Sequence, residues 1–184
     1  ERIGSHQITK RTVSIATGKS TLEAGTRNDE FSCTDTHMCT TYGPRWRMVI
    51  IGAGQLSQYT ADFAIASDFE VIVIDPREEY AEGLNRNDVT FIQGMPDDVL
   101  LEIGVDPHTA VVALTHDPKL DDMALMEALK SSAFYVGALG SKKNTQKRKE
   151  RLLEFDVSQD EVEKLHGPVG LYICLLYTSP SPRD

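Results

Sequence analysis

The chain has 184 residues, of which 40% are hydrophobic, and a formal net charge of −9 at pH 7. This length allows one sizeable buried core with a tail or two, and the negative charge excludes general attraction to nucleic acid or to anionic membranes. The three cysteines do not suggest a disulfide framework, and no apolar run approaches the roughly 18 residues that span a bilayer. The first residues also lack the pattern of a secretory signal, so we expect a cytoplasmic protein.

Residues 1–44 are rich in Thr, Ser, Gly and charge and follow neither a helical nor a strand period for long. We expect an irregular lead-in here, or the remnant of an N-terminal domain. Cys33, His37 and Cys39 lack a fourth ligand and match no zinc spacing, so the sequence predicts no metal site.

The sequence pattern changes at Arg47, where short apolar runs begin to alternate with helical patterns. Runs apolar on both faces are typical of buried parallel strands, and five are present, at 48–51, 71–74, 89–92, 110–114 and 134–136. A helical pattern carrying Leu56, Tyr59, Phe63 and Ala64 follows the first run, and 118–130 is a second helix with Asp117 as its N-cap. The alternation predicts an α/β domain over 45–173, a Rossmann-like doubly wound parallel sheet in the order 3-2-1-4-5.

Two more helices are expected at 143–155 and 158–166, the second opened by a capping box of Ser158 and Glu161. The last residues, 174–184, resemble a translated sequencing adapter more than protein. We expect them to be a non-native tail on a chain truncated near Ile173.

A glycine turn follows the first strand and reads G-x-G-x-x-S. Its six residues are Gly52, Ala53, Gly54, Gln55, Leu56 and Ser57. In the dinucleotide fingerprint the first glycine permits the tight turn, the second lets the backbone approach a pyrophosphate, and a small third residue lets the helix lie close to the strand. The turn therefore predicts a phosphate-bearing ligand, and the alternative is a strand-to-helix turn with no ligand.

Asp75 ends the second strand 21 residues after Gly54. A carboxylate at this place can accept hydrogen bonds from a ribose diol and repels a 2′-phosphate, with which Arg77 could pair. The alternative is that Asp75 only caps the Asp-Pro turn.

Thr115, His116 and Asp117 follow the fourth strand, at the sheet edge where open α/β sheets bind ligands. His116 could donate to a phosphate or polarise a carbonyl, or it could be a loop histidine beside a helix cap. Since no second candidate base is visible, the sequence assigns no catalytic residue.

After the fifth strand, residues 137–141 form a flexible turn that leads into a basic segment. The turn residues Gly137, Gly140 and Ser141 could make a second anion site together with Lys142 and Lys143. We expect the later basic residues of this segment to be solvated and the acidic pair in the preceding helix to be structural. These residues are Lys147, Arg148, Lys149, Arg151, Asp121 and Asp122.

Taken together, the motifs resemble the C-terminal half of the XdhC/CoxI family, the maturation factors of xanthine dehydrogenase and related molybdenum hydroxylases. The resemblance covers about 43–173 and rests on the blocks 51–54, 75–77, 114–122, 134–141 and 166–171. Gln55 and Ser57 stand where many relatives have His and Ala, and 1–44 carries no copy of the family's N-terminal glycine and cysteine motifs.

The resemblance implies a protein that binds the molybdenum cofactor, a phosphorylated pterin dithiolene (molybdopterin). Such a factor protects the cofactor while a cysteine desulfurase or other sulfurtransferase supplies sulfur, then delivers it to the subunit of a molybdenum hydroxylase. We also expect a homodimer. Two alternatives stay open, an NAD-dependent oxidoreductase that binds NAD(H) and a nucleotide-sensing regulatory module.

Overall fold

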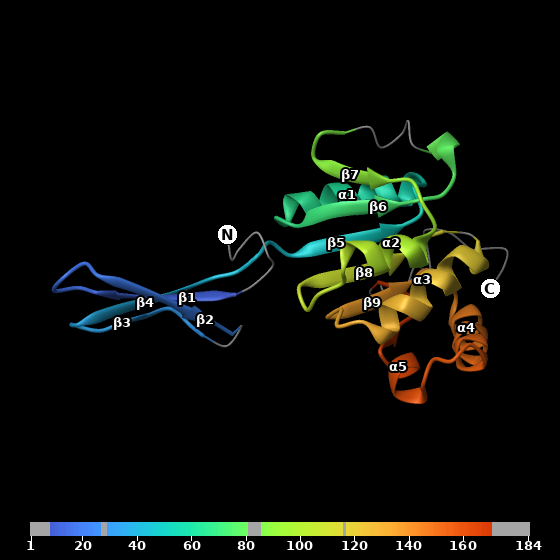
Figure 1. The fold of residues 1–184 in the computed structure, drawn as a ribbon. Coiled ribbons are helices and arrows are strands. Elements are labelled where there is room, and N and C mark those ends of the chain that lie inside the picture. Colours follow the sequence, from blue (N-terminus) through green and yellow to red (C-terminus); the bar gives the residue numbers. More distant parts are fainter. Residues whose placement is uncertain (1–7, 27–28, 81–85, 116, 171–184) are drawn as a thin grey trace, which may run out of the picture.

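We describe residues 8–26, 29–80, 86–115 and 117–170 from a computed structural model. An N-terminal antiparallel sheet precedes a parallel α/β sheet, and the two lie apart from one another except where the chain joins them (Figure 1). His116 and the tail expected at 174–184 lie outside the described residues.

The N-terminal sheet contains four antiparallel strands in the order β2-β1-β4-β3. These are β1 (Thr9–Ser14), β2 (Ser20–Ala24), β3 (Ser32–Cys33) and β4 (His37–Tyr42). The prediction of an irregular lead-in was therefore wrong. The sheet is held by backbone pairing between strands whose side chains are mostly exposed or half-buried, so its sequence carries little of the apolar periodicity by which strands are recognised.

The second sheet contains six parallel strands in the order β10-β9-β8-β5-β6-β7. They are β5 (Arg47–Ile51), β6 (Glu70–Ile74), β7 (Val89–Ile92), β8 (Thr109–Ala113), β9 (Tyr135–Ala138) and β10 (Leu165–His166). The Rossmann-like fold is confirmed. The first five strands take the predicted 3-2-1-4-5 arrangement, and β10 adds a sixth strand beside β9 that the sequence did not predict.

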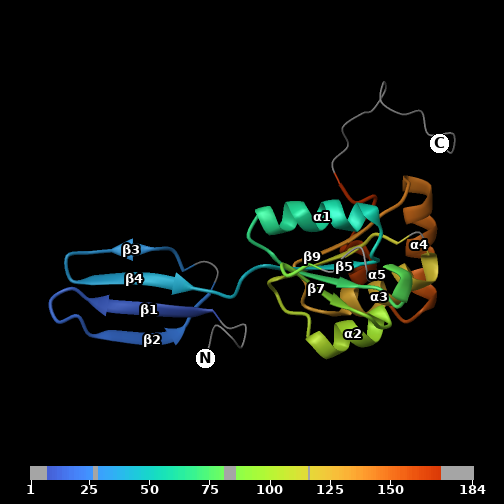
Figure 2. The same cartoon turned by 90° about the horizontal axis from the view of Figure 1, so that it is seen from above.

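Helices cover both faces of this sheet, with α1 on one face and α2, α3 and α5 on the other (Figure 2). The helical segments are α1 (Gln55–Ala66), η2 (Glu78–Tyr80), α2 (Pro96–Ile103), α3 (Pro118–Lys130), α4 (Lys142–Glu154) and α5 (Gln159–Glu163). Helix α2 was not predicted. Helix α5 has the predicted capping box, but it ends before 166 because Leu165 and His166 pair with β9.

The strands are buried on both faces, as the apolar runs predicted. In β5, Val49 and Ile51 pack on the side of α2 and α3, whereas Ile50 packs on the side of α1, and all three are fully buried. This burial fixes the register of β5, because a shift by one residue would exchange the two faces.

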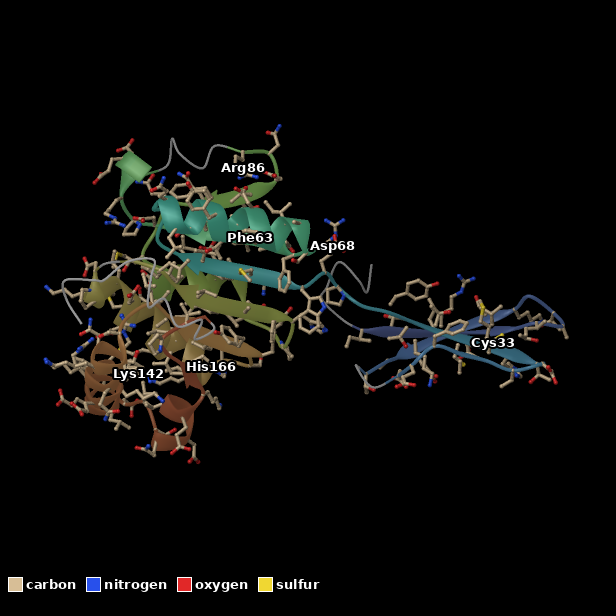
Figure 3. The ribbon with its side chains drawn as sticks, turned by 180° about the vertical axis from the view of Figure 1, so that it is seen from behind. Cys33, Phe63, Asp68, Arg86, Lys142 and His166 are labelled. Atoms are coloured by element: carbon tan, nitrogen blue, oxygen red, sulfur yellow. The ribbon has the colours of Figure 1, made fainter. Side chains whose placement is uncertain are left out.

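Helix α1 packs on the sheet through small residues, Ser57 and the alanines at 61 and 64. The larger apolar residues by which the sequence identified this helix lie on its outer side, with Phe63 76% exposed (Figure 3). A narrow packing face lets the helix lie close to the strands, and this closeness places its N-terminus at the glycine turn.

Candidate ligand-binding crevice

The two glycines of the first turn have different structural roles. Gly52 has a φ of 97°, and a Cβ built on it would lie 2.6 Å from Cγ2 of Thr115, so the fold itself requires glycine here. Gly54 has a φ of −74°, and a Cβ there would meet nothing within 4 Å. Packing does not require glycine at 54, and the space beside it is open to a ligand.

Helix α1 begins at this open space without a protein cap. No side chain caps its N-terminus and its first turn holds no acidic residue. Among the described residues, the backbone N–H groups of Gln55 and Leu56 meet no acceptor. Side chains cap α3, α4 and α5, those of Asp117, Ser141 and Ser158. The N-terminus of α1 therefore offers donors and a positive dipole end to an anion.

Asp75 lies beside the turn, as predicted, but its carboxylate faces inward. One oxygen accepts from the Ala53 N–H (2.8 Å) and from Nη2 of Arg77 (2.8 Å), and the other accepts from the backbone N–H (3.0 Å) and Nε (2.9 Å) of Arg77. Burial alone would raise the pKa of Asp75, but these hydrogen bonds hold it below its usual value. Both oxygens thus accept from the protein's own donors, and the hydrogen bond from the Arg77 N–H is the cap of the Asp-Pro turn that the sequence left as the alternative.

Thr115 joins the end of β8 to α3. Its backbone N–H and its hydroxyl both donate to Oδ1 of Asp121, over 3.3 and 2.7 Å. Asp117 accepts from the Lys119 N–H and so caps α3 as predicted. Burial raises the pKa of Asp121, against the opposing effects of Thr115 and of the Arg148 charge.

Arg148 is buried, contrary to the prediction that this basic residue is solvated. Its Nη2 donates to Asp121 (2.8 Å), its Nε to Asp122 (3.2 Å) and its Nη1 to the Leu139 carbonyl (3.0 Å). Asp122 also accepts from Arg151, and this hydrogen bond raises the pKa of that guanidinium. The acidic pair therefore joins α3 to α4, and Arg148 also ties α4 to the loop that follows β9. The sequence did not reveal these ion pairs because the partners lie 26 and 27 residues apart.

The second predicted anion site is arranged differently from the prediction. Gly137 lies within β9 rather than in a flexible turn, and a Cβ there would lie 2.7 Å from Cε1 of Tyr135. Ser141 accepts from the Asn144 N–H as the cap of α4. Lys142 and Lys143 are exposed at the start of the helix and do not line the neighbouring pocket.

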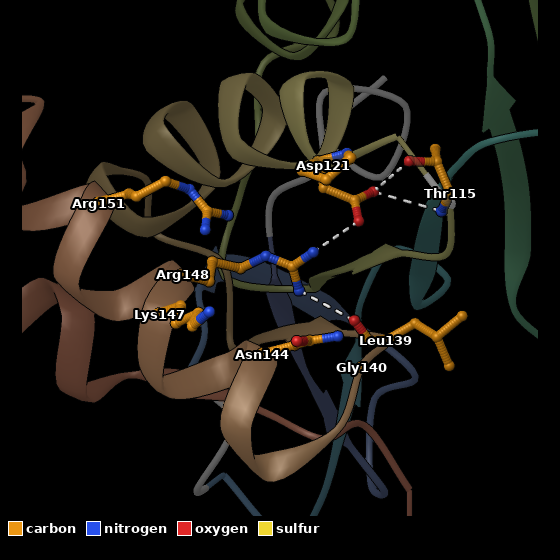
Figure 4. Close-up of a pocket in the computed structure, with 9 residues that line it drawn as sticks. Thr115, Asp121, Leu139, Gly140, Asn144, Lys147, Arg148 and Arg151 are labelled. Atoms are coloured by element: carbon orange, nitrogen blue, oxygen red, sulfur yellow. Dashed lines mark hydrogen bonds and ion pairs between the residues drawn. The ribbon is translucent and has the colours of Figure 1, made fainter. Parts of the chain in front are cut away.

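That pocket has a volume of about 250 Å³ and opens at the carboxyl edge of β8 and β9 (Figure 4). It is lined by Thr115, Pro118, Asp121, Leu139, Gly140, Asn144, Lys147, Arg148 and Arg151. Sequence reasoning missed Asn144, Lys147, Arg148 and Arg151 as lining residues. Their spacing was an available signal, since positions i, i+3, i+4 and i+7 share one face of a helix.

Other kinds of site find no support in the described ranges. No three His, Cys, Asp or Glu side chains in these ranges come together as ligands for a metal ion. No helix in the described part of the chain has the length and apolar character to cross a membrane.

A parallel sheet with helices on both faces, and a glycine turn that leads from its first strand into a helix without a side-chain cap, is typical of a Rossmann domain. Residues 48–175 match the XdhC Rossmann domain, and the chain belongs to this family. Two curated relatives cover most of the chain. It is 27% identical over 145 residues (78% of this chain, 36% of the relative) to the molybdenum cofactor insertion chaperone PaoD of Escherichia coli. This chain is also 30% identical over 131 residues (71% of this chain, 38% of the relative) to a Bacillus subtilis protein named as a probable xanthine dehydrogenase subunit.

A solved structure described as a xanthine dehydrogenase from Bacillus halodurans has the same fold, with a TM-score of 0.70 and 23% identity over 93% of this chain and 55% of that one. The chain thus spans 36% and 38% of the two curated relatives' lengths.

Proposed function

We propose that this chain is the cofactor-binding part of an accessory factor for a xanthine dehydrogenase-type molybdenum hydroxylase. It binds the molybdenum cofactor, assists its sulfuration and takes part in its insertion into the apo-hydroxylase. The partners are a cysteine desulfurase and the hydroxylase subunit. The observation that carries this proposal is membership of the XdhC family, in which one relative is named a molybdenum cofactor insertion chaperone.

The glycine turn fits the phosphate of such a cofactor. The space beside Gly54 is open, and the N–H groups of Gln55 and Leu56 at the start of α1 are available to an anionic oxygen. Gly52 and Asp75 support the turn from within, because the first packs on Thr115 and the second bonds to Ala53. The bound cofactor would supply the redox chemistry of the hydroxylase, whereas this chain's residues bind, orient and shield it.

The nicotinamide alternative is weakened by the surroundings of Asp75. Asp75 was the strongest sequence feature in favour of that alternative. Both of its carboxylate oxygens already accept hydrogen bonds from Ala53 and Arg77. A ribose diol would have to displace these donors from a fully buried group, at the cost of its hydrogen bonds.

Cofactor retention tests the proposal. The purified chain is mixed with molybdenum cofactor released from a molybdenum hydroxylase, passed over a sizing column, and assayed for pterin fluorescence and molybdenum. We expect both to travel with the parent protein and to be lost in Gly54→Asp, because that side chain brings bulk and negative charge to the phosphate space.

The matched control is Gly43→Asp, which adds the same charge at an exposed position in the connection between the two sheets. This control should retain the cofactor. A parent protein that retains neither pterin nor molybdenum, but binds NAD(H), would contradict the proposal in favour of the oxidoreductase or sensor class.

A further inference from the structure

Thr115 is shared by the glycine turn and by the pocket beside Gly140. Its Cγ2 approaches Gly52, and the residue also lines the pocket together with the loop after β9 and one face of α4. The two places therefore neighbour each other along the edge of the sheet where Rossmann domains bind ligands.

The pocket keeps a positive charge that the lining carboxylate, Asp121, and the neighbouring Asp122 do not offset. Asp121 and Asp122 pair with Arg148 and Arg151. Lys147 also lines the pocket, and its ammonium forms no ion pair within the described part of the chain. In a chain with a net charge of −9, a small pocket with three cationic side chains in its lining is a local exception.

Most of the hydrogen-bonding groups that remain in the pocket are donors, and the amide oxygen of Asn144 is an acceptor. Arg148 uses one N–H on each of its three nitrogens for Asp121, Asp122 and Leu139, and each terminal nitrogen carries a second N–H. The Lys147 ammonium and the amide of Asn144 add further donors. The lining carboxylate, Asp121, already accepts from Thr115 and Arg148. Such a lining suits an acceptor-rich anion and disfavours a cation.

The volume of the pocket limits the ligand to a small one. The volume of about 250 Å³ lies below the roughly 300 to 1,000 Å³ typical of pockets that enclose a whole organic ligand. The buried network of Arg148 with Asp121 and Asp122 holds α4 in place, whereas Lys147 and Asn144 are exposed at the mouth of the pocket and take no part in that network.

We propose that this pocket is a second anion site, which binds a compact oxyanion with two negative charges, either a phosphate group or a metal oxyanion. The proposal rests on the proposed function for the source of that group, since the cofactor carries a phosphate at one end and a metal with oxygen ligands at the other. A ligand that is anionic at both ends could occupy the glycine turn and the pocket at once.

Calorimetric titration with inorganic phosphate and with molybdate tests the pocket without the organic cofactor. The titrated protein is Gly54→Asp, in which the glycine turn is blocked and only the second site can bind. We expect this protein to bind one equivalent of anion. Adding Lys147→Met should weaken binding about tenfold, the low end of what a hydrogen bond to a charged group contributes. Lys149→Met removes the same charge from the same helix outside the pocket and should change little.

Each outcome decides the proposal. Loss of anion binding in the Gly54→Asp protein, or equal weakening by Lys147→Met and Lys149→Met, would overturn it. Tighter binding of molybdate would assign the pocket to the metal end, tighter binding of phosphate would assign it to the phosphate end, and equal binding would support a general oxyanion site. Failure of the proposed function would show separately, as loss of pterin retention by the parent protein.

Discussion

The carboxylate of Asp75 accepts a hydrogen bond of 2.8 Å from the backbone N–H of Ala53, which ties the end of β6 to the glycine turn after β5. The same carboxylate also holds the side chain and backbone of Arg77. A residue that the sequence predicted as a ligand contact is thus part of the support of the turn. Its substitution should change the stability of the fold.

Asp75→Asn should lower the free energy of unfolding by about 2 to 3 kcal/mol, because an amide replaces one accepting oxygen by a donor that faces other donors in a buried place. Urea unfolding measures the loss. The control is Asp117→Asn at the exposed cap of α3, since Asn caps helices about as well as Asp. Unchanged stability together with an altered NAD(H) to NADP(H) ratio would show instead that the carboxylate meets a ribose.

The pH dependence of stability should differ in sign between Asp75 and Asp121. Burial opposes ionisation at Asp75, but hydrogen bonds from Arg77 and Ala53 lower its pKa, so its stabilisation is present above the unfolded value of about 3.9 and is lost as the pH falls through the folded value. Burial raises the pKa of Asp121, so its ionisation opposes folding as the pH rises from about 3.9 through the folded value.

Urea unfolding of the parent, Asp75→Asn and Asp121→Asn across the acid range measures both effects. The parent's advantage over Asp75→Asn should shrink towards low pH, whereas its advantage over Asp121→Asn should shrink towards neutral pH. Parallel profiles for the two variants would contradict the opposite environments assigned to these carboxylates.

The two glycines of the turn should respond differently to alanine. Gly52→Ala should cost about 2 to 4 kcal/mol, from a positive φ and from a Cβ that would lie 2.6 Å from Thr115. Gly54→Ala should cost less than about 1 kcal/mol, because its Cβ would enter open space. Thermal or urea unfolding of both proteins decides the matter, and equal losses would mean that the space beside Gly54 is filled by the protein itself.

Arg148→Met should destabilise the domain by about 3 to 5 kcal/mol, because it leaves the buried carboxylates of Asp121 and Asp122 without their shared cation. Lys149→Met, one residue further along α4, is the matched control and should stay within about 0.5 kcal/mol. If the two variants were equally stable, Arg148 would be as solvated as its place in a basic run of the sequence suggested.

The outer face of α1 should tolerate polar substitution. Phe63→Ser should change the unfolding free energy by less than about 0.5 kcal/mol, since this side chain is 76% exposed. Ala61→Ser, on the packed side of the same helix, should cost more because it places a larger, polar side chain at a fully buried position. The reverse order of effects would place α1 the other way round on the sheet.

The candidate site was predictable only in part. The glycine turn was found from local signals, because a strand, a glycine pair and a helix follow one another within a few residues. The inward direction of Asp75 and the pocket formed by Thr115, Gly140 and Lys147 depend on contacts between segments far apart in the sequence. The run of basic residues in the sequence predicted a solvated helix face. That prediction failed for Arg148 because Asp121 and Asp122, which pair with it, are far from it in the sequence.

The sequence by itself determined the Rossmann fold, its first five strands and their order, because apolar runs and right-handed crossovers constrain a parallel sheet strongly. Only the tertiary structure revealed the N-terminal sheet, strand β10 and the packing face of α1. The first of these is held by backbone pairing between exposed or half-buried strands, the second by two residues paired with β9, and the third by small side chains. None of the three leaves an apolar periodicity in the sequence, so each was decided by which segments meet in space.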